Sequence, residues 1–166
     1  MFNILVITDN KLSSLNQCNS VVNELKRISN KKIAVEYIEV YLTLLAYLPN
    51  FLLYFFFKIR YSFKSIKKID FIISCGRVSA PLNLVLKKKS SAKNCHILNP
   101  YFKKNEFDKI IIPEHDIKKT VEKNVITTFG SLVDIKILKK KNQKVCKSLA
   151  NKKKKISFFF GGKGKS

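Results

Sequence analysis

The opening residues decide the fold: FNILVIT at 2–8 is followed by NKLSSLNQCNSVVNELKRIS at 10–29 and IAVEYIEV at 33–40. The first run is short, apolar and rich in β-branched side chains, which is typical of a buried strand. The second run places apolar side chains at helical spacing, with Ser13 or Ser14 available as an N-cap, and the third alternates apolar with polar residues. A strand, an amphipathic helix and a second strand predict the first βαβ unit of a parallel sheet.

The same order recurs further along the chain. IDFIIS at 69–74 ends in Cys-Gly-Arg, and residues 80–86 then predict a helix that tolerates Pro81 in its first turn. Short apolar runs at 95–98, 109–112 and 125–128 have the length and spacing of strands. About six strands separated by helices or loops predict an α/β fold, a Rossmann-like doubly wound parallel sheet that we place at residues 1–133.

Composition excludes several classes of protein. The 166 residues carry a net charge of +22 yet are 46% hydrophobic, so the chain is not an apolar-poor disordered protein. The four cysteines form no CxxC pair, which excludes a disulfide scaffold and favours a reducing compartment, and the two histidines have no zinc-ligand spacing. Lys greatly outnumbers Arg, and Lys provides diffuse charge rather than base-specific contacts, so we expect no specific nucleic-acid partner.

An uncharged apolar stretch occupies residues 40–57, with Pro49-Asn50 near its centre. Five basic residues follow it within 58–68. Apolar side chains beside a basic cluster favour peripheral contact with an anionic membrane surface. Two alternatives remain: helices that pack in the core, and a membrane-spanning helix close to the lower length limit. Because no signal peptide precedes the stretch, we expect the protein in the cytoplasm, peripheral at the inner membrane.

Polar loops follow the predicted strands, where open α/β sheets bind ligands. The loop at 8–17 ends in Asn-Gln, and in the loop at 74–77 the glycine allows close approach while Arg77 can pair with phosphate or carboxylate. In the loop at 113–116, His115 lies between two carboxylates, an arrangement suited to a general base. The alternative for this last loop is a solvated histidine beside a helix-capping aspartate.

The last residues indicate a second domain. Residues 134–155 are predicted to form a basic linker or helix, and ISFFF at 156–160 predicts a strand that runs into a glycine-rich loop. GKS at 164–166 does not complete a GxxxxGK[ST] phosphate loop, because Phe159 occupies the first glycine position. Successive glycine amides after a strand can still bind phosphate. We therefore expect residues 156–166 to open a second lobe that is truncated here.

The order of these motifs resembles the mitochondrial fission protein family of bacteria and plants. The resemblance rests on ILVITDNKLSSLNQ, ISCGRVSAPLNLVLKKKS, HILNPYFKKNEFDKIIIPEHD, KNVITTFGSL and ISFFFGGKGKS, and SCGR and FDKIIIPEHD are its most specific pieces. It implies the N-terminal lobe of a GT-B-type glycosyltransferase with two Rossmann-like domains.

The resemblance also implies positions for a site. His115 and Asp116 are the candidate catalytic residues, and no metal ligand is implied. The residues implied to bind substrate at the cleft between the lobes are Asp9, Asn16, Gln17, Gly76, Arg77, Glu114, Gly161 and Gly162.

The implied activity is transfer of a sugar from a nucleotide-sugar donor to a lipid-linked or glycan acceptor at a membrane, without a resident cofactor. This chain alone is expected to be inactive. A second interpretation is a non-catalytic, membrane-associated interaction module, consistent with the role of the plant relatives in recruiting fission machinery.

Overall fold

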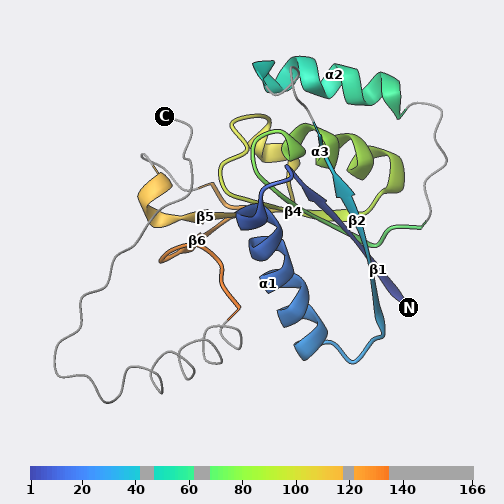
Figure 1. The fold of residues 1–166 in the computed structure, drawn as a ribbon, viewed down its shortest axis with the longest axis vertical. Helices are drawn as coiled ribbons and strands as arrows, with labels where there is room; N and C mark the ends of the chain where they lie inside the picture. The colour runs from blue at the N-terminus through green and yellow to red at the C-terminus, as the bar shows by residue number, and fades with distance from the viewer. Residues whose placement is uncertain (42–46, 62–67, 118–121, 135–166) are drawn as a thin grey trace, which may run out of the picture. The chain divides into compact units, whose positions relative to one another are not determined.

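The computed structural model describes residues 1–41, 47–61, 68–117 and 122–134. These residues form a six-stranded, all-parallel sheet with the strand order β2-β1-β3-β4-β5-β6 (Figure 1). The Rossmann-like α/β prediction is confirmed. The strands are β1 (Phe2–Thr8), β2 (Ile33–Glu39), β3 (Phe71–Cys75), β4 (Lys93–Ile97), β5 (Lys109–Pro113) and β6 (Val125–Thr128).

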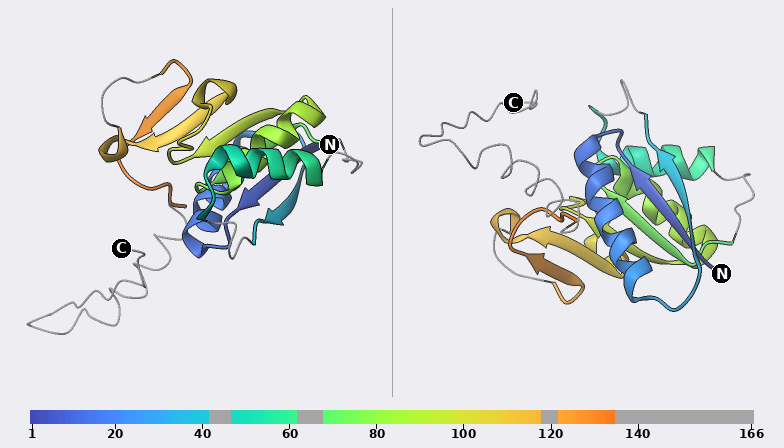
Figure 2. Two further views of the ribbon diagram at one scale, coloured as in Figure 1. Left: turned by 90° about the horizontal axis from the view of Figure 1, so that it is seen from above. Right: turned by 60° about the horizontal axis from the view of Figure 1, so that its bottom comes forward.

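Helices cover both faces of the sheet. Helix α1 (Leu12–Ile28) packs on one face, and α3 (Ser79–Ser90) packs on the other, with α2 (Asn50–Arg60) lying over α3 (Figures 1 and 2). Side chains along β1 point alternately to the two faces of the sheet, so each face has its own apolar cluster. Ile4 and Val6 face the cluster that contains α1, whereas Leu5 and Ile7 face the cluster that contains α2 and α3. All four of these side chains are buried, as expected for a central parallel strand.

Helix α3 lies between the sheet and α2, and its sequence reflects this position. Its first eight residues, SAPLNLVL, are buried on every side, and the lysines that follow emerge into solvent. A helix with no polar face is stable only when neighbours cover all of it. Leu53, Tyr54 and Phe57 of α2 provide the cover on the side away from the sheet.

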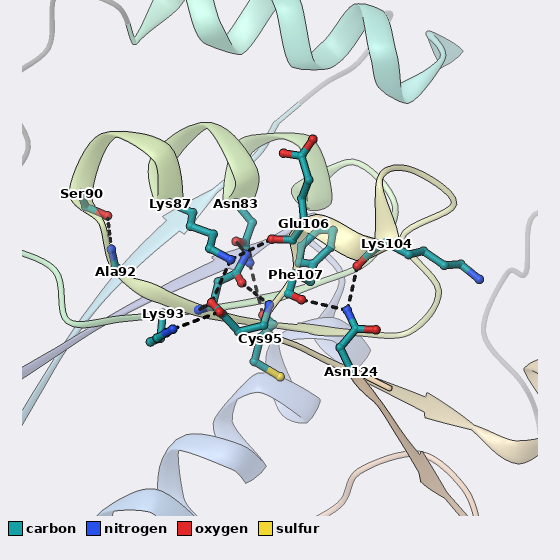
Figure 3. A network of polar contacts seen from close by, with 12 residues as sticks. Asn83, Lys87, Ser90, Ala92, Lys93, Cys95, Lys104, Glu106, Phe107 and Asn124 are labelled. Atoms are coloured by element: carbon teal, nitrogen blue, oxygen red, sulfur yellow. Dashed lines mark hydrogen bonds and ion pairs between the residues drawn. The ribbon is translucent and has the colours of Figure 1, made fainter. Parts of the chain in front are cut away.

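A buried polar network fixes α3 to the sheet (Figure 3). The Asn83 amide donates to Ser74 Oγ at 2.6 Å and to the Cys95 carbonyl at 3.2 Å, and it accepts from Asn94 at 2.7 Å. Asn94 in turn accepts from the Asp108 backbone amide at 2.8 Å. These bonds connect α3, β3, β4 and the start of β5, so they constrain how the layers are aligned.

Asp108 extends the network to the protein surface. Its carboxylate lies 2.9 Å from Lys87 Nζ and accepts from the Asn94 backbone amide at 2.9 Å. Partial burial would raise the pKa of Asp108, but the bonds from Lys87 and Asn94 outweigh it and hold the pKa below its ordinary value.

His96 lies fully buried in the same layer. Because the Ser74 hydroxyl oxygen accepts from Asn83, its hydrogen is available to His96 Nδ1, 2.7 Å away. Nε2 then carries the ring proton, and it has no hydrogen-bond partner among the described residues. Burial lowers the pKa of His96 to about 3, so the ring is neutral in the folded protein.

The sequence-based element boundaries hold within a few residues, with one correction. Helix α1 begins at Leu12, and Lys11 occupies the N-cap position without a side-chain bond. The predicted capping by Ser13 or Ser14 is therefore wrong, because both serines lie inside the first turn. The left-handed backbone of Asn10, with φ 59°, turns the chain into the helix two residues earlier than the apolar spacing indicates.

The apolar stretch at 40–57 includes one described helix, α2, which begins at Asn50 directly after Pro49. No helix in the described part of the chain combines the length and apolar character needed to cross a membrane. The linker predicted at 134–155, except Asp134, and the strand and glycine loop predicted at 156–166 lie outside the described residues.

Burial of neutral His96 predicts a specific loss of stability in acid. The unfolded chain, with an ordinary histidine pKa near 6.5, binds more protons than the folded chain between that value and about 3. The free energy of unfolding should therefore fall by about 2 kcal/mol between pH 7 and pH 5. Chemical denaturation at a series of pH values measures this slope.

His96→Gln should flatten the slope between pH 7 and pH 5, because this variant has no buried imidazole that must stay neutral. An equally steep fall in the His96→Gln variant would contradict the assignment.

Candidate functional site

The carboxyl ends of the six parallel strands lie at one edge of the sheet. From β1 the chain moves to β2 on one side and later to β3, β4, β5 and β6 on the other, so the strand order reverses between β1 and β3. Open α/β sheets bind ligands at such a switch point. The loops that contain SCGR and PEHD follow β3 and β5, so both lie at this edge.

Unusual backbone conformations occur in the loops that leave this edge. Six described residues have positive φ, and five of them lie in the loops after β1, β3 and β4. For residues other than glycine this conformation is uncommon, and strained backbone is enriched at functional sites. The five are Asn10, Gly76, Leu98, Tyr101 and Lys103.

Asp9 and Gly76 meet at the switch point. Gly76 has φ +91°, and a Cβ on it would lie 2.6 Å from Asp9 Oδ2, so a side chain here would overlap the carboxylate. The sequence predicted that glycine allows a ligand to approach the backbone. In the structure the group that approaches it is the Asp9 carboxylate, whose side chain is 8% exposed and lies 3.6 Å from exposed Lys11 Nζ.

Two buried acceptors beside the switch point have no partner. Asp9 Oδ1 and Gln17 Oε1, the latter from the second turn of α1, form no hydrogen bond within the described residues. Nearly all buried polar atoms in folded proteins are hydrogen-bonded, and leaving one unpaired is unfavourable. Both atoms therefore have a free acceptor position, which a bound molecule can reach only when neighbouring side chains move, because neither atom is exposed to solvent.

Two buried thiols, those of Cys18 and Cys75, lie close together behind the carboxylate. Their mutual hydrogen bond, followed by burial and the nearby charges, raises the pKa of Cys18 far above its ordinary value. Burial alone raises the pKa of Cys95 to about 12. Since the thiolate is the nucleophile, Cys18 and Cys95 are packing residues and not candidates for covalent catalysis.

Arg77 joins three segments at this edge. Its Nη1 donates to the Leu48 carbonyl at 2.9 Å and to Asn50 Oδ1 at 3.0 Å. The Asn50 amide donates to the Pro100 carbonyl at 2.8 Å. Arg77 thus holds the start of α2 against the loops after β3 and β4, a role that the sequence analysis missed. The only available signal was an asparagine directly after a proline at a helix start.

The predicted acid–base residues lie on an exposed turn. Glu114–Asp116 form a 3₁₀ turn directly after β5, and all three side chains are exposed. His115 Nε2 lies 3.9 Å from Asp116 Oδ1, with the two side chains 68% and 42% exposed. The pair lies at the carboxyl edge as predicted, in contact with solvent.

The remaining predicted site residues are placed differently. Asn16 is exposed, and its carbonyl accepts a bond from the Ser20 hydroxyl at 2.9 Å. Gly161 and Gly162 lie outside the described residues. Within residues that the structure describes, no group of three or more His, Cys, Asp or Glu side chains could hold a metal ion.

Comparison with known proteins agrees with this arrangement of motifs. Residues 14–166 match the mitochondrial fission ELM1 family. The chain belongs to this family. This ELM1-family chain is also 35% identical over 122 residues to the uncharacterized protein RP120 of Rickettsia prowazekii (strain Madrid E). The match covers 70% of the chain and 33% of RP120, so the chain spans about a third of that relative's length. No solved structure matches it.

The contact between Asp9 and Gly76 predicts that Gly76→Ala strains the switch point. The added methyl group must displace the carboxylate, and φ +91° is unfavourable for alanine, so we expect a loss of about 2 kcal/mol in the free energy of unfolding. Denaturant titration measures this loss in the free energy of unfolding.

Two further variants separate the contact with the Asp9 carboxylate from backbone strain as causes of this loss of stability. Gly130→Ala, where no atom lies within 4 Å of the added Cβ, should change stability little. Combining Gly76→Ala with Asp9→Ala should recover part of the loss, because the double variant has no carboxylate to displace. Strict additivity of the two single effects would show that the contact is not the cause.

Proposed function

We propose that this chain is the N-terminal lobe of a nucleotide-sugar-dependent glycosyltransferase of GT-B type, with the carboxyl edge of the sheet at the β1/β3 switch point as its ligand site. The observation that carries the proposal is the pair of buried, unpartnered acceptors, Asp9 Oδ1 and Gln17 Oε1, at that point of a Rossmann-like sheet. The rickettsial relative that this chain matches is about twice as long, and a second lobe with the donor site fits that length.

The chemistry of the two acceptors favours a carbohydrate. Both atoms accept hydrogen bonds, so the ligand must present donors, and the hydroxyl groups of a sugar are donors. A hydrogen bond from a hydroxyl to a carboxylate is charge-assisted and stronger than a bond between neutral groups. Phosphate, which offers only acceptors when fully ionised, is a poor match for this part of the edge.

Transfer also requires a base for the acceptor hydroxyl, and His115 is the proposed one. In the transfer step the acceptor oxygen forms a bond to the anomeric carbon of the donor while the bond from that carbon to the diphosphate breaks. The acceptor proton passes to His115, Asp116 stabilises the resulting imidazolium, and the diphosphate leaves with the electron pair. Glycine amides at 161–162 and a cationic side chain are proposed to stabilise the diphosphate, with no resident cofactor.

The second candidate function is a non-catalytic, membrane-associated interaction module. The exposure of both His115 and Asp116 favours it, because a general base is usually tuned by burial or by a fixed partner. In either case we propose that the protein acts in the cytoplasm, peripheral at the inner membrane. Sugar binding separates the two candidates.

Calorimetric titration of this chain with UDP-sugars and with soluble analogues of lipid-linked sugars tests the first candidate. We expect at least one sugar to bind, and Asp9→Ala to lower its affinity about tenfold through loss of a charge-assisted bond. Glu36→Ala, which removes an exposed carboxylate on the edge strand β2, should leave the affinity unchanged. If no sugar binds, the interaction module is the better interpretation.

Transfer itself is tested in a longer family member that contains both lobes. Labelled UDP-sugar and a membrane extract provide donor and acceptor. Alanine at the positions that correspond to His115 and Asp116 should lower the rate of product formation about a hundredfold, the usual contribution of a general base. Unchanged product formation would remove both residues from the mechanism.

A further inference from the structure

Helix α2 is apolar on nearly all sides, but its described neighbours cover only one of them. Its inner side packs Leu53, Tyr54 and Phe57 into the core shared with α3. Its outer side exposes large apolar side chains, with exposed fractions from 36% to 72%. We call this set the outer stripe of α2: Phe51, Leu52, Phe55, Phe56 and Ile59.

The outer stripe is continuous and lies at the outside of the described fold. Its positions, separated by one, three, one and three residues, fall along one face of a helix. Figures 1 and 2 show α2 as the outermost layer over α3, with its far side directed away from the sheet. A continuous apolar surface of this kind marks a site of interaction with another molecule or a membrane.

The charges around the stripe are basic. Lys58 and Arg60 occupy the last turn of α2, and neither forms an ion pair with a carboxylate of the described residues. Between Glu39 and Asp70 the sequence contains no acidic residue and five basic ones. The complementary surface is therefore apolar and anionic.

We propose that the outer stripe of α2 docks on an anionic lipid bilayer. The helix lies in the plane of the surface, its phenylalanine, leucine and isoleucine side chains enter the boundary between headgroups and acyl chains, and Lys58 and Arg60 contact lipid phosphates. Helices with this division of apolar and basic residues bind membranes by apolar burial together with attraction to anionic lipids.

The charge pattern argues against a second copy of this chain as the occupant. Two chains paired through their outer stripes would bring Lys58 and Arg60 of each close to the same residues of the other. Each chain already carries a formal charge of +22. Like charges placed opposite each other oppose association, whereas an anionic bilayer neutralises them. The inference is independent of the proposed sugar transfer.

The absence of tryptophan from the sequence allows a direct test of insertion. In Phe55→Trp the single indole lies on the stripe. Its emission should shift to shorter wavelength on addition of vesicles of phosphatidylcholine with phosphatidylglycerol, and brominated acyl chains should quench it. Phe129→Trp places the indole at a position that is 96% exposed and distant in sequence from α2, and its emission should not change.

A second arm separates the stripe from the lysine-rich residues 136–166, which also attract anionic lipid. The double variant Phe55→Ser with Ile59→Ser keeps every charge, and we expect its affinity for the same vesicles to fall about tenfold or more. The matched control, Leu12→Ser with Ile28→Ser, removes two exposed apolar side chains from α1 and should bind as the unchanged chain does. Circular dichroism checks that both variants are folded.

Several results would overturn the proposal. They are an unshifted Phe55→Trp emission, equal vesicle affinity for the two double variants, and equal binding to vesicles of phosphatidylcholine alone. A dimer in gel filtration that the stripe variant abolishes would assign the surface to a second copy instead. Failure of sugar binding would leave this inference untouched, because the fluorescence and vesicle-affinity measurements contain no sugar.

Discussion

The parallel pairing of β1 with β3 is the constraint on which the described fold depends. It follows from β2 taking the opposite side of β1, so that the chain must cross over the sheet before β3 can pair. The crossover from β2 to β3 places α2 on the face opposite α1, and the connection from β3 to β4 places α3 on that same face. The same pairing brings the end of β1 beside the end of β3, where the Asp9 carboxylate fills the space that a side chain at position 76 would need.

Polar groups in the interior are a second constraint on the fold. Asn83 provides three hydrogen bonds from a helix that is otherwise apolar, and each of them ends on a different residue of β3 or β4. Buried amides of this kind allow few alternative alignments, because any shift of the helix would leave them unpaired. The alignment of α3 then fixes the loop that holds Gly76 and Arg77, so the interior network also positions the carboxyl edge.

Local patterns in the sequence were sufficient for the strands and for the fold class. The β-branched runs at 2–8 and 109–112 are mostly buried, as their composition indicates, and the glycine after β3 marks the turn into α3. Long-range pairings had no such signal. Nothing in the sequence near Ser74, His96 or Asn83 indicates that they meet, since they are separated by 9 to 22 residues and belong to three elements. The sequence alone could not show which apolar side of α2 is covered. It also could not show that the turn around position 115 is exposed.

The placement of the cysteines gives the lobe an internal reporter. Cys18, Cys75 and Cys95 are all inaccessible and occur in three different elements, α1, β3 and β4. An alkylating reagent can reach them only when the layers separate, so the rate at which these three thiols are modified follows the equilibrium between closed and open forms. Peptide mapping of the modified chain would show whether α1 detaches before the centre of the sheet or together with it.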